Sequence, residues 1–127
     1  MFIKFKSAYK KIAMGLLSYM PEEKDVKKLQ ETIRNYEENE QWQLYLWKEA
    51  DDIIGVLGLY FYEDNTARLQ HLCVNPSYRD EGIGRKMVLT MKERLDGDLI
   101  GCDETVEFLG ACIEDNEKNK QTGEVSG

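Results

Sequence analysis

The residues with the clearest chemical signature lie between a strand-like segment and a helix-like segment. Residues 79–84 read Arg-Asp-Glu-Gly-Ile-Gly and are followed by Arg85 and Lys86. The first N–H groups of a helix have no partner inside the helix, and the helix dipole makes this end attractive to anions. Glycines at positions 82 and 84 let the backbone approach a bulky ligand closely. The segment therefore predicts a cradle for a pyrophosphate group.

Two common phosphate-binding motifs do not fit this segment. A Rossmann dinucleotide site needs a third glycine three positions after the second one, and that position holds Met87. A P-loop needs a hydroxyl residue directly after Gly-Lys, and Gly84-Arg85-Lys86 has none. For an isolated Gly-x-Gly, an ordinary helix start remains the alternative interpretation.

The elements that must position this segment follow from hydrophobic periodicity. The pattern predicts strands at 2–6, 42–47, 53–62, 67–74 and 99–100, and helices at 9–20, 21–36, 83–95 and 103–113. Pro21 suits the first turn of the second helix. Three successive strands with short turns predict an antiparallel meander. We expect one α/β (α+β) domain over residues 1–113, and a polar, disordered tail over 114–127 because that segment has almost no apolar residue to bury.

Composition limits the kinds of partner. The chain has 127 residues, enough for one core, and a net charge of -7, which argues against nucleic acid and suits a cationic amine or basic peptide. Its single histidine and three widely spaced cysteines predict neither a metal site nor a disulfide framework. It contains no apolar run long enough to span a membrane and no secretory signal pattern, so we expect a cytoplasmic protein.

The stretch 72–84, Leu-Cys-Val-Asn-Pro-Ser-Tyr-Arg-Asp-Glu-Gly-Ile-Gly, resembles the acetyl-coenzyme A signature of the GCN5-related N-acetyltransferase (GNAT) superfamily, Gln/Arg-x-x-Gly-x-Gly/Ala after a strand. The order of predicted elements is also similar to that fold, a mixed, mostly antiparallel sheet flanked by about four helices. The resemblance implies acetyl-CoA as cofactor, no metal, and a small-molecule or protein amine as acceptor. It implies these cofactor-binding residues: Leu72, Cys73, Val74, Arg79, Asp80, Glu81, Gly82, Ile83, Gly84 and Arg85. The resemblance also implies that the fourth and fifth strands splay apart to form a cleft.

Several positions depart from the family pattern. The position of the family's frequent catalytic tyrosine holds Leu109, and the position of a glutamate base holds Arg68. His71, the only side chain with an ordinary pKa near neutrality, is a candidate general base on the face shared by Leu69 and Cys73. A buried structural histidine is the alternative interpretation.

The family usually has two further strands after the fourth helix, and here they are missing. The sheet edge near residues 99–100 would then be exposed, so we expect a second copy of the chain to cover it. The hypotheses for function are an N-acetyltransferase working by direct transfer, a non-catalytic coenzyme A sensor or interaction module, and a scaffold with a vestigial cleft. Asp80 and Glu81 predict weaker cofactor binding than a basic loop would give.

Overall fold

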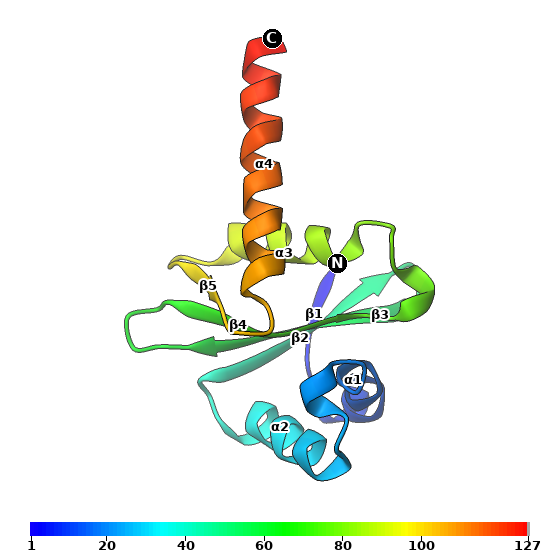
Figure 1. Cartoon of the computed structure of the whole chain (residues 1–127). Helices are drawn as coiled ribbons and strands as arrows, with labels where there is room; N and C mark the ends of the chain where they lie inside the picture. Colours follow the sequence, from blue (N-terminus) through cyan, green and yellow to red (C-terminus); the bar gives the residue numbers. More distant parts are fainter. Residues whose placement is uncertain (127) are drawn as a thin grey trace.

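A five-stranded sheet with helices on both faces forms the body of the molecule (Figure 1). The structure is a computed structural model that describes the backbone of residues 1–126 and the side chains of residues 1–116. The strands are β1 (Phe2–Lys4), β2 (Trp42–Glu49), β3 (Asp52–Phe61), β4 (Ala67–Val74) and β5 (Leu99–Gly101). The helices are α1 (Lys10–Leu17), α2 (Val26–Glu38), α3 (Ile83–Arg94) and α4 (Val106–Ser126), with 3-10 turns η1 (Ser7–Tyr9), η2 (Pro21–Glu23) and η3 (Pro76–Tyr78).

The strands lie in sequence order, β1-β2-β3-β4-β5. The first four pair antiparallel, which confirms the predicted meander. After β4 the chain crosses through α3, and β5 therefore pairs parallel to β4. This pairing covers only three residue pairs, Ala67↔Leu99, Arg68↔Ile100 and Leu69↔Gly101. The predicted α/β fold with a mixed, mostly antiparallel sheet is confirmed.

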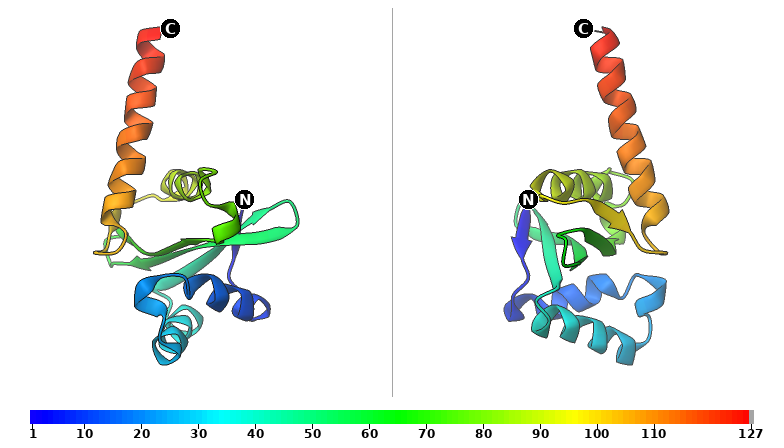
Figure 2. Two further views of the ribbon diagram at one scale, coloured as in Figure 1. Left: turned by 45° about the vertical axis from the view of Figure 1, so that its right-hand side comes forward. Right: turned by 90° about the vertical axis from the view of Figure 1, so that its left-hand side faces the viewer.

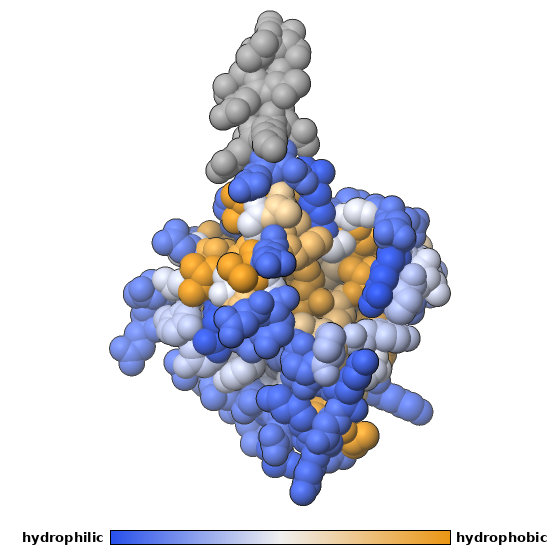
Figure 3. Space-filling model, viewed as in Figure 1, coloured by the Kyte–Doolittle hydropathy of each residue, from blue (hydrophilic) through white to orange (hydrophobic). Residues whose placement is uncertain are grey.

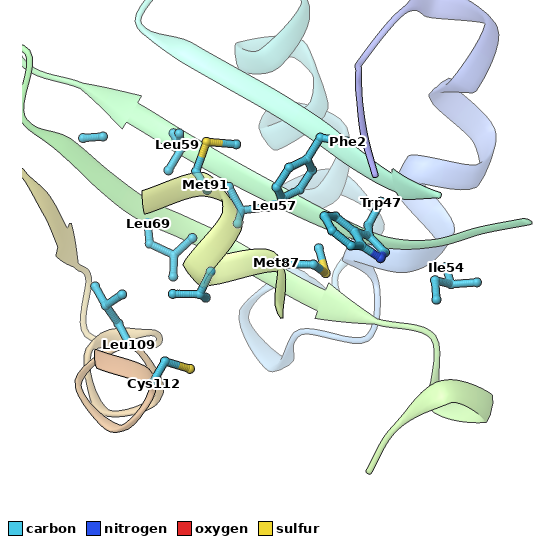
Figure 4. Packing of buried hydrophobic residues seen from close by; sticks show 12 residues of the cluster. Phe2, Trp47, Ile54, Leu57, Leu59, Leu69, Met87, Met91, Leu109 and Cys112 are labelled. Atoms are coloured by element: carbon cyan, nitrogen blue, oxygen red, sulfur yellow. The ribbon is translucent and has the colours of Figure 1, made fainter. Parts of the chain in front are cut away.

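Two layers of helices bury the two faces of the sheet (Figure 2). Helices α1 and α2 cover one face, and α3 with the first turns of α4 covers the other. On the second face Met87 and Met91 of α3 pack onto Leu57 and Leu59 of β3 (Figure 4). Helix α3 comes this close because β3 has Gly55 there, where an added Cβ would lie 2.9 Å from the sulfur of Met87. The start of α3 is thereby fixed over the middle of the sheet.

The second helix begins later than the sequence predicts. Residues 21–23 form the turn η2, and α2 starts only at Val26. The side chain of Asp25 accepts a hydrogen bond from the N–H of Lys27 at 2.9 Å, so Asp25 is the N-cap. The prediction that Pro21 lies in the first turn of α2 is therefore wrong. Val26, the first residue of α2, is 65% exposed.

Helix α4 continues to Ser126, and its ribbon projects away from the sheet (Figures 1 and 2). A helix therefore occupies most of the segment 114–127 for which the sequence predicts a disordered tail. The shortage of apolar residues in this segment argues only against a packed core. It does not argue against a helix, because lysine, glutamate and glutamine are good helix formers. No helix in the described part of the chain is both long and apolar enough to span a membrane.

Candidate active site

A β-bulge in β4 determines which side chains face which layer. Gly58 of β3 pairs with His71, but the next residue, Leu59, pairs with Leu69, so Gln70 is an extra residue in β4. Leu69 packs in the core below α3 and α4, whereas Cys73 packs in the core against α1 and α2. The bulge reverses the alternation, so His71 shares a face with Cys73 and not with Leu69. The prediction that all three share one face is wrong.

Beyond the bulge, β4 and β5 separate. The last β4–β5 pair is Leu69↔Gly101, and the Thr105 hydroxyl then donates to the Leu69 carbonyl at 2.6 Å. The N–H of Asn75 donates to a β3 carbonyl at 2.7 Å. Because main-chain groups alternate in an antiparallel pair, those of Leu72 and Val74 point toward the open side. The splay that the family resemblance implies is present, and it leaves this edge of β4 without a partner strand among the described residues.

The splay opens into a cleft of about 770 Å³. This volume falls within the range of small-molecule sites. Figure 3 shows it as a hollow with a largely apolar surface beside the foot of α4, flanked by hydrophilic side chains. Its walls include these predicted cofactor-binding residues: Leu72, Cys73, Val74, Arg79, Asp80, Gly82, Ile83, Gly84 and Arg85. Glu81, the remaining one, is exposed next to them.

The N-terminus of α3 opens into this cleft. Gly82 is the N-cap, with φ = 75°, a left-handed conformation that favours glycine. The N–H of Lys86 is the first to bond along the helix, to the Gly82 carbonyl at 3.0 Å. Among the described residues, the N–H groups of residues 83–85 have no acceptor, as helix geometry requires. An added Cβ at Gly82 would meet nothing within 4 Å, so the space beside the N-cap is open, whereas an added Cβ at Gly84 would lie 3.2 Å from the ring of Phe108.

Positive charge accompanies these amides. Arg85 lines the cleft, and its Nε is buried with no hydrogen-bond partner in the described part of the chain. A buried donor without an acceptor is costly, and a phosphate oxygen is a suitable acceptor. Arg79 adds a second, exposed guanidinium, while Asp80 and Glu81 oppose both. The residues present therefore fit a phosphate-bearing ligand such as coenzyme A.

His71 lies beneath the cleft and is not one of its lining residues. It is 2% exposed. Its Nε2 is 2.9 Å from a carboxylate oxygen of Glu23, and its Nδ1 is hydrogen-bonded to the hydroxyl of Tyr36. Both ring nitrogens are thus occupied by buried partners. This placement gives no support to His71 as a general base and favours the structural interpretation.

Cys73 lines the cleft, but its thiol is a poor nucleophile. Burial, together with the nearby charge of Glu22, raises the pKa of Cys73 to about 12. The thiolate, which is the reactive form, is therefore scarce at neutral pH.

The opposite wall of the cleft was not predicted from the sequence. It is formed by the turn between α1 and α2 and by the start of α4, through these residues: Tyr19, Met20, Pro21, Glu22, Glu104, Thr105 and Phe108. Nothing in the local pattern of residues 19–22 marks them as a wall, because their position depends on how α1 packs against β3 and β4. The described residues contain no cluster of three or more His, Cys, Asp or Glu side chains that could hold a metal ion.

Comparison with known proteins identifies the class. A family model described as the acetyltransferase (GNAT) family matches residues 10–122. The chain therefore belongs to this family and is an N-acetyltransferase by that membership.

A relative from Bacillus methanolicus, described as an uncharacterized N-acetyltransferase in the lysA 3' region, is 47% identical over 113 residues, covering 88% of this chain and 94% of its own length.

Solved structures share the fold at low sequence identity. AAC(6')-Iy, solved in complex with the bisubstrate analog CoA-S-monomethyl-acetylneamine, is 8% identical with a TM-score of 0.67, over 91% of this chain and 87% of its own. A GNAT family acetyltransferase from Elizabethkingia anophelis, solved with acetyl-CoA bound, is 18% identical with a TM-score of 0.58. That match covers 74% of this chain but only 56% of the other, so this chain spans little more than half of that protein.

Proposed function

We propose that this protein transfers an acetyl group from acetyl-CoA to an amine by direct attack, without an acetylated enzyme. The observation that carries the proposal is that one cleft joins three features. These are the unpaired amides at the start of α3, the unpartnered Nε of Arg85, and the open edge of β4 at Leu72 and Val74. A phosphate group suits the first two, and an extended chain with amides suits the third.

Each part of the cleft would then have a separate task. The unpaired N–H groups of residues 83–85 and the Arg85 guanidinium would hold the pyrophosphate, whereas the N–H of Arg79 already donates to the Pro76 carbonyl at 3.3 Å. The main chain of Leu72 and Val74 would pair with the pantetheine amides. Acetyl-CoA would supply the thioester: the amine nitrogen attacks its carbonyl carbon, the C–S bond breaks, and coenzyme A leaves as a thiolate that takes a proton from water. The edge of β4 directs this end of the ligand toward the bulge at Gln70, where β4 and β5 begin to separate. Binding in one orientation supplies proximity, which is a large part of the rate enhancement available to direct transfer.

The acidic side chains of the cleft favour a cationic acceptor. Glu22 and Glu104 line it from two different elements, and the buried Oε1 of Glu22 has no partner among the described residues. A carboxylate oxygen in that situation is stabilised by an ammonium group. The family's frequent acid and base are replaced by the buried Leu109 and by Arg68, which stacks on Tyr60 at 4.9 Å. We therefore assign proton removal to water next to these two carboxylates.

Calorimetric titration with acetyl-CoA tests the proposal first. Saturable binding is expected, and no binding would leave the vestigial-scaffold hypothesis. Thiol release is then measured with a panel of primary amines, including diamines, polyamines and a lysine-rich peptide. Release that depends on the amine supports transfer. Binding without release from any amine would favour the coenzyme A sensor.

Charge in the cradle makes a specific prediction. Glu81→Gln is expected to lower the dissociation constant for acetyl-CoA about threefold at low salt, because one exposed negative charge near the pyrophosphate is removed. The gain should shrink as sodium chloride is raised, since salt screens the repulsion. Glu93→Gln, an exposed site at the far end of α3, is the matched control. Equal dissociation constants for Glu81→Gln and the unsubstituted protein at low salt would contradict the prediction.

A second resemblance bears on the cellular setting of the protein. The segment Lys11–Leu17 and the core segment 72–84 resemble RibT, the acetyltransferase of bacterial riboflavin operons, and this resemblance names no acceptor. A cytoplasmic location would suit a consumer of acetyl-CoA, and it rests only on the sequence pattern.

We also propose that a second copy of the chain covers the free edge of β5. Among the strands that the structure describes, β5 pairs with β4 alone. Ile100 is 43% exposed, and Val106, which packs over Gly101, is 51% exposed. An exposed apolar strand edge is usually paired or covered. Sedimentation velocity at rising concentration should show a dimer, and Ile100→Lys should shift it toward the monomer. A protein that remains a monomer at high concentration would rule the dimer out.

A further inference from the structure

A buried polar cluster lies under the cleft on the side of α1 and α2. It consists of Glu23, Thr32, Tyr36 and His71, which are 1%, 3%, 7% and 2% exposed. Thr32 donates its hydroxyl hydrogen to one oxygen of Glu23 at 2.8 Å, and the other oxygen is 2.9 Å from Nε2 of His71. Tyr36 completes the chain at Nδ1. Polar groups are rarely buried this deeply without a structural or functional reason.

The cluster joins η2 and α2, which are neighbours in the sequence, to β4, which is distant from both. Glu23 ends η2, and the residues just before it, Met20 to Glu22, form a wall of the cleft. His71 is the residue after the bulge in β4 and lies two positions before Cys73, which lines the cleft. The Glu23–His71 contact therefore connects one cleft wall directly to the strand that forms the other.

The hydrogen-bonding states of these groups agree with one another. Burial alone would raise the pKa of Glu23, but hydrogen bonds from His71 and Thr32 outweigh it and keep that pKa below its ordinary value. Glu23 is therefore a carboxylate at neutral pH and accepts a hydrogen bond from the Nε2–H of His71. Burial raises the pKa of Tyr36 well above its ordinary value, so its hydroxyl keeps its hydrogen and donates it to Nδ1. With the Tyr36 hydroxyl donating to Nδ1, an imidazole that carries its hydrogen on Nε2 satisfies the whole chain, a tautomer assigned from the network.

The geometry points to Glu23 and His71 as positioning residues: we propose that their buried hydrogen bond holds the η2 wall against β4 and so sets the width of the acceptor end of the cleft. The functional part of this inference rests on the proposed acetyl transfer, because that is the reaction the cleft would serve. Neither residue exchanges a proton with the substrate. Each acts through the wall residues Met20, Pro21 and Glu22.

Alkylation of Cys73 by iodoacetamide reports on this wall without any substrate. Cys73 is 6% exposed, and its thiol lies against the main chain of Met20. Glu23→Ala should raise the alkylation rate of Cys73 about tenfold, the factor expected when a charge-assisted buried hydrogen bond is lost and local opening becomes easier. The rate is read by mass spectrometry on the Cys73 peptide. Cys112, in the core on the other face, is the internal control and should not change.

Two further variants make the result specific. Glu23→Gln keeps an oxygen for His71 and a polar group for Thr32, so it should recover most of the protection, to within about threefold of the unsubstituted protein. Glu31→Ala, on the exposed face of α2, should leave the rate unchanged. If Glu23→Ala does not fold, Tyr36→Phe removes a single hydrogen bond from the cluster and should raise the Cys73 rate about threefold.

Unchanged Cys73 alkylation in Glu23→Ala, or in Tyr36→Phe if that variant has to replace it, would overturn the proposal. So would an equal rise at Cys112, which would mean general loosening of the fold.

Kinetics supply the functional half of the test. With the best amine of the panel, Glu23→Ala should raise the KM for the amine about tenfold and change the dissociation constant of acetyl-CoA less than about twofold, because the cradle at α3 is separate from the η2 wall. Weakening of both by the same factor would indicate a general structural defect and overturn the positioning role. Absence of acetyl-CoA binding in the unsubstituted protein would defeat the proposed function, and the alkylation result would stand apart from it.

Discussion

Acetyl-CoA binding is expected to weaken by at least about 100-fold when Gly82 is replaced by tryptophan, since two or more charge-assisted hydrogen bonds to the pyrophosphate would be lost at roughly 1.5–3 kcal/mol each. An indole at this position would project into the open space in front of the α3 amides, where an added Cβ meets nothing within 4 Å. The indole would therefore occupy space needed by the ligand and would not clash with the protein core. Isothermal titration measures the effect.

Two controls separate occlusion from backbone strain. Gly82→Ala keeps the left-handed conformation at φ = 75° and its cost of about 1 kcal/mol, but leaves the space open, so it should retain binding within a few-fold. Gly110→Trp adds the same side chain on an exposed stretch of α4 and should not affect binding. Binding by Gly82→Trp at the affinity of Gly110→Trp would show that the cradle lies elsewhere.

A second large effect is expected at Gly58, on the opposite face of the sheet. Tyr36 passes directly over this glycine to reach His71, and an added Cβ would overlap the Tyr36 hydroxyl and lie 2.6 Å from its ring carbon Cζ. Gly58→Ala should therefore lower the free energy of unfolding by about 2–3 kcal/mol, through overpacking and loss of the hydrogen bond to His71. Urea denaturation monitored by tryptophan fluorescence gives the value.

A double-mutant cycle tests the reason for this loss. Tyr36→Phe removes the hydroxyl and the hydrogen bond, so the Gly58→Ala/Tyr36→Phe protein should be about 1 kcal/mol more stable than the sum of the two single losses predicts. Gly15→Ala, at an exposed helical glycine with nothing within 4 Å, should instead be neutral or stabilising. Strict additivity of the two substitutions would mean that the Tyr36 hydroxyl is not what Gly58 accommodates.

The elements of the cofactor side could be predicted because their signals are local. The alternation in residues 67–74, the turn residues after Val74 and the glycines before a helical period all lie within about one strand–turn–helix unit, and the structure places β4 and the start of α3 as expected. The start of α2 was missed for a reason that is also local. Asp25 caps the helix with its side chain, and this outweighs the preference of Pro21 for a first turn.

The acceptor side could not be predicted, because its signals are tertiary. Gly55 and Gly58 interrupt an apolar segment and so suggest a bulge or close packing there, and the register shift does lie at Gly58. They do not indicate that the extra residue is Gln70 of the neighbouring strand, which decides which layer His71 faces. A side chain larger than that of glycine is excluded at position 58 by Tyr36, which lies 22 positions earlier in the chain. The hydrogen-bond partner of His71 at Nε2 is Glu23, 48 positions earlier. The sequence marks His71 as the only histidine in the chain, but only the packing shows that its partners are protein groups beneath the cleft.

The brief pairing of β4 with β5 would also tie the stability of this domain to the ligand proposed for the cleft. A pantetheine arm lying along β4 would supply hydrogen bonds that no neighbouring strand provides, so the occupied protein is the more complete sheet. Because such a ligand binds the native chain and not the unfolded one, resistance to unfolding rises with the logarithm of its concentration. A cell with abundant acetyl-CoA would therefore hold this protein in a longer-lived form than a starved one.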